Sequence, residues 1–367
     1  MTFFLRPRPG RLVPLLCALG VAACDIPSSP PIFEQTWIVP ADSTTIGVSS
    51  LLPTNVGLNG GGTAFTVTTP AANIPRTLGA ICTDPACQNP GPVTVPSTPA
   101  FSSGAGALSN TINFPAGVNA LTVSGGTLQI QVTNNIGFDP IRPNGVAGPF
   151  GSITVGITSG AVTSNTVVNG SATQGMPNGA TTTLDIPVPT GNYASSVTVA
   201  VTLSAPAGPS ATIASGNTFN IAASLVGFTV SNATVVVNSK PITTTPASFD
   251  LAGVDVGDVV QGGGLVLEVV NPFNATASLS LVLAAPPQGG GPAVSISKSL
   301  NLAASTTSNL SLTLLKSELA SLLGKSNVTI SVTGNATGAG AGNTVSVSPT
   351  AEIKVRTKLS ITIQVGG

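Results

Sequence analysis

The stretch VSGGTLQIQVTN at residues 123–134 recurs in altered form as VQGGGLVLEVVN at residues 260–271. The identical positions are Val123, Gly125, Gly126, Leu128, Val132 and Asn134 in the first copy and Val260, Gly262, Gly263, Leu265, Val269 and Asn271 in the second. Two further pairs follow in the same chain order: SVTVAVT at 196–202 with NVTISVT at 327–333, and GNTFNI at 216–221 with GNTVSV at 342–347. Matches that keep their order over this length indicate two copies of one structural unit, each the size of a typical domain.

Within both copies, apolar residues recur at every second position. Leu128, Ile130 and Val132 alternate with polar side chains, and the same alternation runs through 197–203 and 353–365. A period of two places one face of a strand in a core and the other in water. Clusters of Gly, Asn and Pro separate these runs at hairpin-like intervals, so we predict an all-β chain in which each copy folds as an antiparallel β-sandwich.

One helix is predicted inside the second copy. Leu315, Leu319, Leu322 and Leu323 fall on one helical face, and Gly324 follows at the position of a C-terminal cap. The first copy has VPTGNYASS at the corresponding place. We therefore expect the helix to be a crossover that differs between the copies.

The second copy also resembles a known family. LVLEVVNPFNATASLSLVL at 265–283 is similar to the opening of the water-stress/hypersensitive-response domain, also called the late-embryogenesis-abundant type 2 domain. In that family an alternating strand runs into Asn-Pro-x-Asn, which Asn271, Pro272 and Asn274 match here, whereas the first copy has VTNNIGFDP. The resemblance covers 251–365 and implies a fibronectin-like β-sandwich with no catalytic residues to transfer.

The first 24 residues have the order of an export signal. Arg6, Arg8 and Arg11 form a positive segment, and residues 12–23 are apolar and end in small side chains. This run is too short to cross a bilayer, which takes about 20 apolar residues. The sequence VAAC, ending at Cys24, resembles the lipobox of bacterial lipoproteins, which implies cleavage before Cys24 and acylation of that residue. The alternative is an ordinary signal peptide in which this cysteine is incidental.

Cys82 and Cys87 are the cysteines that remain outside the signal and the lipid-attachment position. An even pair in an exported chain predicts a disulfide, here closing the tight loop CTDPAC. Zinc binding is the alternative role for the pair, but two cysteines cannot complete a zinc site and the sequence contains no histidine. We expect the bridge to act as a local clip, because so short a loop removes little chain entropy.

Composition excludes several classes of function. Lys+Arg and Asp+Glu balance at 12 each and charged residues make up only 7% of the chain, so we expect no basic surface for nucleic acid. A mean hydropathy of +0.44 does not fit simple disorder. Without histidine, a hydrolase would need an acid pair or a Ser-Lys arrangement, and the acids are too dispersed to nominate a pair. We predict neither enzymatic activity nor a cofactor.

The chain upstream of the first copy differs from both copies. The segment DIPSSPP is a stiff proline-rich tether, and the strand-like runs after it are expected to dock on the first sandwich. Trp37 is predicted to be a packing anchor, with ligand stacking as the alternative. The predicted organisation is a signal peptide over 1–23, a tether and strand-containing region over 24–113, β-sandwich 1 over 114–230, a connector over 231–250 and β-sandwich 2 over 251–367.

Three carboxylates gather near the junction between the copies, at Asp250, Asp255 and Asp258. Carboxylates at this density, together with backbone carbonyls, suit calcium. There is no EF-hand spacing, and isolated aspartates are ordinary turn residues. The sequence leaves both interpretations open.

Lys354, Arg356 and Lys358 project to the same side of one predicted strand. They could meet an anionic polymer. We expect instead that they protect an exposed strand edge from pairing with another chain.

Together these features predict a non-catalytic lipoprotein of the bacterial cell envelope, exported and anchored by lipid at Cys24, on the periplasmic side or at the cell surface. Its expected role is structural or adhesive, through the surfaces of the sandwiches, with the membrane and a protein or polysaccharide as partners. The alternative is a binding module for a polysaccharide or small ligand, in which Trp37 or loop aromatics stack on sugar.

Overall fold

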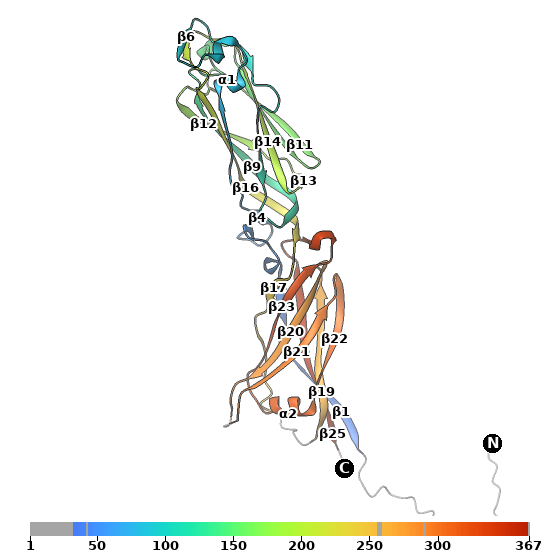
Figure 1. The fold of residues 1–367 in the computed structure, drawn as a ribbon. Coiled ribbons are helices and arrows are strands. Elements are labelled where there is room, and N and C mark those ends of the chain that lie inside the picture. Colours follow the sequence, from blue (N-terminus) through green and yellow to red (C-terminus); the bar gives the residue numbers. More distant parts are fainter. Residues whose placement is uncertain (1–31, 42, 255–258, 289–290, 366–367) are drawn as a thin grey trace, which may run out of the picture.

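The computed structural model describes residues 32–41, 43–254, 259–288 and 291–365, which form antiparallel sheets with a few short helices. Figure 1 shows the sheets as two units placed end to end, each with two layers of strands. We call the unit that holds most of residues 56–236 the first unit, and the other the second unit. The predicted all-β class is confirmed.

The larger sheet of the first unit has the strand order β12-β9-β16-β4-β3, and β13, β5 and β24 pair beside this path. Its strands are β3 (Val56–Leu58), β4 (Phe65–Val67), β5 (Ala72–Thr77), β9 (Val118–Asn135), β12 (Ala180–Pro187), β13 (Gly191–Tyr193), β16 (Thr218–Val236) and β24 (Thr344–Val347). The second layer has the order β11-β10-β14-β7, with β8 also beside β14. Its strands are β7 (Phe101–Ser102), β8 (Leu108–Asn113), β10 (Ser152–Ser159), β11 (Val162–Asn169) and β14 (Ser196–Ala205).

The second unit also has two layers. One has the order β1-β25-β19-β22 with β2 beside β25, and the other has the order β17-β23-β20-β21 with β18 beside β23. The strands are β1 (Phe33–Pro40), β2 (Thr44–Gly47), β17 (Lys240–Thr243), β18 (Ala247–Phe249), β19 (Val260–Asn271), β20 (Ala275–Ala285), β21 (Val294–Leu302), β22 (Thr306–Leu314), β23 (Val328–Gly338) and β25 (Glu352–Val365).

The remaining elements are small. A two-stranded sheet pairs β6 (Val93–Val95) with β15 (Ala211–Ile213). The helices are α1 (Leu78–Ile81), α2 (Lys316–Leu322) and the single 3-10 turns η1 (Val48–Ser50), η2 (Pro85–Gln88), η3 (Gly145–Ala147) and η4 (Ala341–Asn343). In Figure 1, α1 and β6 lie at the end of the first unit that faces away from the second unit, and α2 lies at the opposite end of the molecule.

The two units repeat one scheme of strand pairing. The order β12-β9-β16 corresponds to β22-β19-β25, and β11-β10-β14 corresponds to β21-β20-β23. The repeated stretches form β9 and β19, and Leu128 pairs with Leu225 of β16 where Leu265 pairs with Leu359 of β25. All four leucines lie on paired long strands at equivalent places in the two units. The sequence repeat therefore corresponds to a repeat in strand pairing.

The strand order does not confirm the fibronectin-like arrangement. In an immunoglobulin-type sandwich, the last strand lies in the sheet of the third and sixth strands. Here the last long strand of each unit, β16 or β25, pairs instead with the first long strand, β9 or β19. What the structure supports is therefore the coarser class of several packed antiparallel sheets.

The first two strands lie in the second unit. We expected the strand-like runs upstream of the first copy to dock on the first sandwich, and this is wrong for β1 and β2. Both pair with β25, with Trp37 opposite Ile361 and Ile46 opposite Ile353. The physical reason is that a long strand with an alternating apolar face needs neighbours on both edges. The first unit meets the same need with β4 and β5, which pair along β16.

A short strand exchange joins the two units. β24 leaves the second unit between β23 and β25 and pairs with the end of β16, with Ala233 opposite Val347 and Val236 opposite Thr344. Backbone hydrogen bonds continue past this pairing, from the Val237 N–H to the Asn343 carbonyl oxygen at 2.9 Å and from the Gly338 N–H to the Val237 carbonyl oxygen at 2.8 Å. The junction is thus held by backbone pairing as well as by the connecting chain.

The paired glycines of the repeat lie where the middle strands change register. Gly126 adopts a φ of +146°, which disfavours a side chain, close to a register shift between β9 and β16. At the equivalent Gly263, a side chain would collide with the carbonyl oxygen of Ser360 and with Leu319 of α2. The glycines therefore permit an irregularity in one unit and a close helix approach in the other.

The predicted helix is confirmed as α2. Leu319 and Leu322 are fully buried, and Gly324 adopts the left-handed conformation of a C-terminal cap, with φ of 72°. Leu315, which we expected on the buried face, is the N-cap residue and is exposed. The first unit has the short strand β13 at the corresponding place, so this crossover differs between the units as predicted.

A buried asparagine makes the same corner in both units. The Oδ1 atom of Asn134 or Asn271 accepts a hydrogen bond from the N–H two residues later, and Nδ2 donates to the carbonyl four residues later and to a distant loop carbonyl. All six bonds measure between 2.6 and 3.1 Å. The partners are Ile136, Phe138 and Met176 for Asn134, and Phe273, Ala275 and Ala303 for Asn271. This repeated motif residue is therefore structural.

The predicted disulfide is present. Cys82 and Cys87 are bonded with their Cα atoms 6.0 Å apart, and both side chains are fully buried between α1 and η2. The loop between them is ordered by Asp84, whose carboxylate accepts a hydrogen bond from the Ala86 N–H at 2.9 Å. The Gln88 side chain closes the loop by donating to the Cys82 carbonyl oxygen at 2.6 Å.

We expect Asn271→Ala to lower the free energy of unfolding by about 2–3 kcal/mol, because it leaves one buried N–H and two carbonyls without partners. Asn134→Ala should cost a similar amount. Asn309→Ala, on an exposed position of β22, is the matched control and should change stability by less than about 0.5 kcal/mol. Urea unfolding monitored by circular dichroism measures all three, and equal stability of the corner and control variants would contradict the structural role.

Replacing both Cys82 and Cys87 with alanine should lower the free energy of unfolding by about 2 kcal/mol, the value expected for closure of so short a loop. The effect should appear in the unfolding transition of the first unit. Reducing agent should destabilise the unmodified protein by the same amount and leave the double variant unchanged. A reductant effect that persists in the variant would show that the bridge is not its cause.

Candidate functional site

A polar groove crosses the outer face of the larger sheet of the first unit, where β9, β16 and β5 lie side by side. Ala222 of β16 stands in register between Gln131 of β9 and Asn73 of β5. Because the alanine side chain is short, a hollow of about 350 Å³ remains between the two amides. Its lining residues are Asn73, Ile74, Pro75, Gln131, Thr133, Asn220, Ile221 and Ala222.

The groove continues toward α1. A second hollow of about 290 Å³ shares Pro75 and Asn220 with the first and is also lined by Arg76, Thr77, Ala80 and Thr218. The Arg76 guanidinium is engaged by backbone, since Nε donates to the Ala107 carbonyl oxygen and Nη1 to the Pro75 carbonyl oxygen, both at 2.9 Å. We call the two hollows together the amide groove.

Amides and hydroxyls line the amide groove together with aliphatic side chains, and Arg76 is the one charged residue among its described lining residues. Its amides and hydroxyls each present hydrogen-bond donors and acceptors, and neither hollow is lined by a carboxylate. Part of this capacity is used within the protein, as where Thr133 and Thr181 hydroxyls lie 2.9 Å apart. The arrangement suits a ligand rich in hydroxyl or amide groups better than a metal ion, since no carboxylate is among the described residues that line it.

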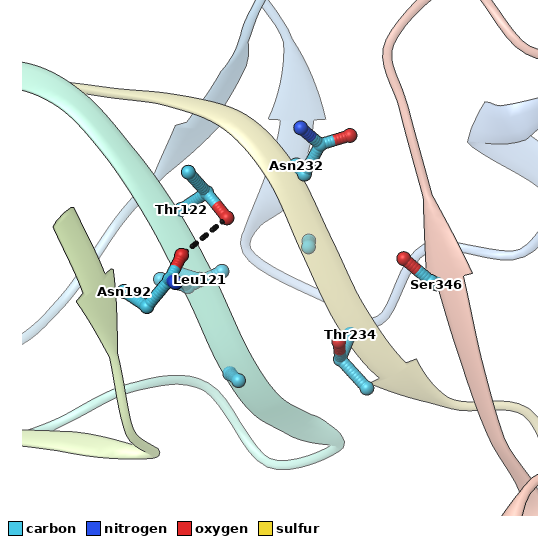
Figure 2. A pocket seen from close by; sticks show the side chains of 8 residues that line it. Leu121, Thr122, Asn192, Asn232, Thr234 and Ser346 are labelled. Atoms are coloured by element: carbon cyan, nitrogen blue, oxygen red, sulfur yellow. Dashed lines mark hydrogen bonds between the residues drawn. The ribbon is translucent and has the colours of Figure 1, made fainter. Parts of the chain in front are cut away.

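A separate polar hollow, distinct from the amide groove, lies beside the junction between the units. Figure 2 shows Thr122 of β9, Asn192 of β13, Asn232 and Thr234 of β16, and Ser346 of β24 around it. Its volume is about 170 Å³, and the Thr122 hydroxyl donates to Asn192 Oδ1 at 2.9 Å. This hollow is smaller than either part of the amide groove and has no titratable lining residue.

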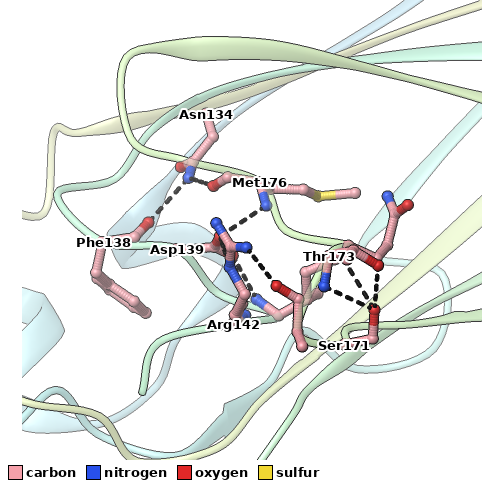
Figure 3. A network of polar contacts seen from close by, with 10 residues as sticks. Asn134, Phe138, Asp139, Arg142, Ser171, Thr173 and Met176 are labelled. Carbon is pink, nitrogen blue, oxygen red and sulfur yellow. Dashed lines mark hydrogen bonds and ion pairs between the residues drawn. The ribbon is translucent and has the colours of Figure 1, made fainter. Parts of the chain in front are cut away.

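The ion pair of the first unit is structural. Figure 3 shows Asp139 and Arg142 next to the Asn134 corner. Asp139 Oδ1 accepts from the N–H groups of Ile141 at 3.1 Å and Arg142 at 2.9 Å, and Oδ2 accepts from the Met176 N–H at 2.8 Å. The Arg142 Nη1 donates to a loop carbonyl. These groups hold the loop after β9, so they are unsuited to acid–base work.

Of the three carboxylates considered for calcium, the structure describes Asp250 alone. Asp255 and Asp258 lie outside the described residues, as does the predicted lipid-attachment residue Cys24. Asp250 Oδ1 accepts from the Ala252 N–H at 3.0 Å, which is an ordinary turn contact. Within the described ranges, no group of three carboxylate or cysteine side chains is placed to hold a metal ion.

The basic row of β25 does not protect an edge. β25 pairs with β19 on one side and with β1 and β2 on the other, so this prediction is wrong. Two of the cations are paired with exposed acids, Lys354 with Glu352 at 3.4 Å and Arg356 with Glu268 at 3.6 Å. Such exposed pairs contribute little to stability.

Trp37 is not an enclosed packing anchor. It lies on the edge strand β1 and 39% of its surface is exposed. It is also remote from the amide groove, because β1 belongs to the second unit and the groove to the first. Stacking of Trp37 on a ligand in this groove is therefore excluded.

Among the residues that the structure describes, Tyr193 and Glu318 have shifted pKa values, and both have structural roles. Burial raises the pKa of Tyr193 to about 12, and its hydroxyl donates to the Pro189 carbonyl oxygen at 2.8 Å. A hydrogen bond from Lys298 lowers the pKa of the Glu318 carboxyl, which also accepts from the Leu315 N–H at 2.8 Å. Glu318 thus caps the start of α2 rather than serving as a catalytic acid.

Among the described residues, no helix has the length and apolar character required to span a membrane.

Comparison with known proteins leaves the family unassigned. No family model matches the sequence, and no curated protein matches it. A Parabacteroides distasonis protein inferred to be secreted is 11% identical, with a TM-score of 0.32, over 91% of this chain and 100% of its own. The tandem CBM22 domains of Paenibacillus barcinonensis Xyn10C are 9% identical, with a TM-score of 0.18, over 88% of this chain and 98% of theirs. Scores this low carry no argument about function.

Proposed function

We propose that the chain is a non-catalytic lipoprotein of the bacterial cell envelope, anchored through lipid at Cys24, whose two β-rich units serve a structural or adhesive role. The N-terminal sequence supports the anchor, since a basic segment, a short apolar run and VAAC follow one another in the order of a lipoprotein signal. One acyl chain binds a membrane only marginally, so stable anchoring requires the two or more chains that lipoprotein modification supplies.

The observation that carries the proposal is where the chain enters the fold. β1 begins at the end of the second unit that faces away from the first unit (Figure 1). A chain anchored at Cys24 therefore has its second unit next to the membrane and presents its first unit outward. The outward unit carries the amide groove on an open sheet face. This arrangement favours contact with a partner beyond the membrane over a reaction at its surface.

A polysaccharide-binding module is the second candidate, and the amide groove favours it. Neutral amides and hydroxyls along an open groove match the hydroxyl groups of a glycan chain. The described lining contains no aromatic side chain, so this version of the hypothesis relies on hydrogen bonds instead of the stacking that we expected from sequence.

Protease treatment of intact cells tests the main proposal. We expect peptides of the first unit to be released from cells that make the unmodified protein, and lipid to be found on Cys24 by mass spectrometry. Cys24→Ala should lose the lipid and accumulate as unprocessed precursor. Absence of lipid on Cys24 in the unmodified protein would contradict the anchor. Protection of the first unit until the envelope is opened would place it in the periplasm and argue against adhesion.

A glycan array followed by titration tests the second candidate. Gln131→Ala should weaken a genuine glycan interaction about five-fold, the loss expected for one hydrogen bond worth about 1 kcal/mol. Asn309→Ala on the second unit is the control and should bind normally. Saturable binding that Gln131→Ala leaves unchanged would exclude the amide groove as the glycan site.

A further inference from the structure

The end of the second unit that lies away from the first carries uncovered apolar side chains. In the strand register, Trp37, Ile361, Gly263 and Leu314 form one row across the layer β1-β25-β19-β22. Residues beyond this row lie toward the same end, and several are exposed. We call the exposed apolar side chains of β1, together with those beyond this row on the neighbouring segments, the basal patch, namely Phe33, Trp37, Ile38, Val259, Leu315 and Val365.

The basal patch is not an ordinary strand edge. Phe33 and Ile38 are 62% and 63% exposed, although they lie on opposite faces of β1. Trp37 points to the same side of the sheet as its fully buried partner Ile361, yet the second layer leaves it partly open. An exposed apolar edge strand is a site of unwanted association unless something covers it.

We propose that the basal patch lies in the headgroup and acyl boundary of the membrane that carries the lipid anchor. The inference rests on the proposed attachment at Cys24. Phe33 is the ninth residue after Cys24, so even a fully extended chain keeps β1 within about 30 Å of the anchored residue. The patch is thus presented to the bilayer surface permanently and at close range. An exposed tryptophan among aliphatic side chains is the composition that favours this boundary.

The proposed contact gives the anchor a second function. Lipid alone would leave the second unit free to pivot on its tether, whereas apolar contact on both faces of β1 fixes the end that meets the membrane. The first unit would then be held away from the surface. The two remaining occupants, a second copy of the chain or no occupant, give different outcomes in the test below.

Trp37 is the single tryptophan of the sequence, so tryptophan fluorescence reports on the basal patch alone. The protein is purified from envelopes with its anchor retained and reconstituted into phosphatidylethanolamine and phosphatidylglycerol vesicles, with or without bromine on the acyl chains. We expect blue-shifted Trp37 emission and strong quenching by the brominated lipid. Phe33→Ser with Ile38→Ser should lose most of the quenching. Val167→Ser with Val226→Ser, at exposed positions of the first unit, should retain it.

The outcomes separate the patch from the anchor. If Cys24 carries lipid and Trp37 is not quenched, the inference is overturned while the anchor stands. If Cys24 carries no lipid, the same vesicles are added to the purified protein, and quenching that requires Phe33 and Ile38 still supports the patch. Absence of quenching in that arm overturns it. Shielding of Trp37 that depends on protein concentration and not on bromine would assign the patch to a second copy and also overturn the proposal.

Discussion

The antiparallel pairing of β1 with β25 is the interaction on which the arrangement of this protein depends. It brings the first strand of the described chain beside the last, so the second unit is closed by segments more than 300 residues apart. Everything between β2 and β17 is then an insertion, and that insertion supplies all of the first unit except β24. The pairing has a simple cause, since β25 has buried side chains at alternate positions and would otherwise expose an apolar edge.

Local patterns in the sequence predicted the features that depend on local structure. The period-two runs became β9, β14, β19 and β25, the leucine face became α2, and the CTDPAC loop is closed by a disulfide. The repeated asparagine also has a local explanation, because two of its three hydrogen bonds reach only two and four residues ahead. Such contacts are encoded within a short window, so one sequence suffices to anticipate them.

Features that depend on distant pairing could not be predicted. β1 and β24 are short, and nothing in their residues identifies β25 or β16 as the partner. For this reason the expectation that Lys354, Arg356 and Lys358 protect a strand edge was wrong, since the partners of β25 on that side come from the distant strands β1 and β2. The amide groove was missed because Asn, Gln and Thr are frequent throughout the chain. It exists only where Ala222 lies between two longer side chains from other strands.

Because the first unit is an insertion, its connections determine how force and chain breaks in it affect the second unit. The first unit is connected through two covalent segments, one after β2 and one before β17, and through the hydrogen bonds of β24 with β16. A pull on the first unit therefore reaches β2 and β17 together, on opposite layers of the second unit. A single break inside the first unit would leave β1 and β2 paired with β25 and the second unit closed. If the chain is anchored at Cys24 as proposed, a cut in the outward first unit would leave the unit next to the membrane closed.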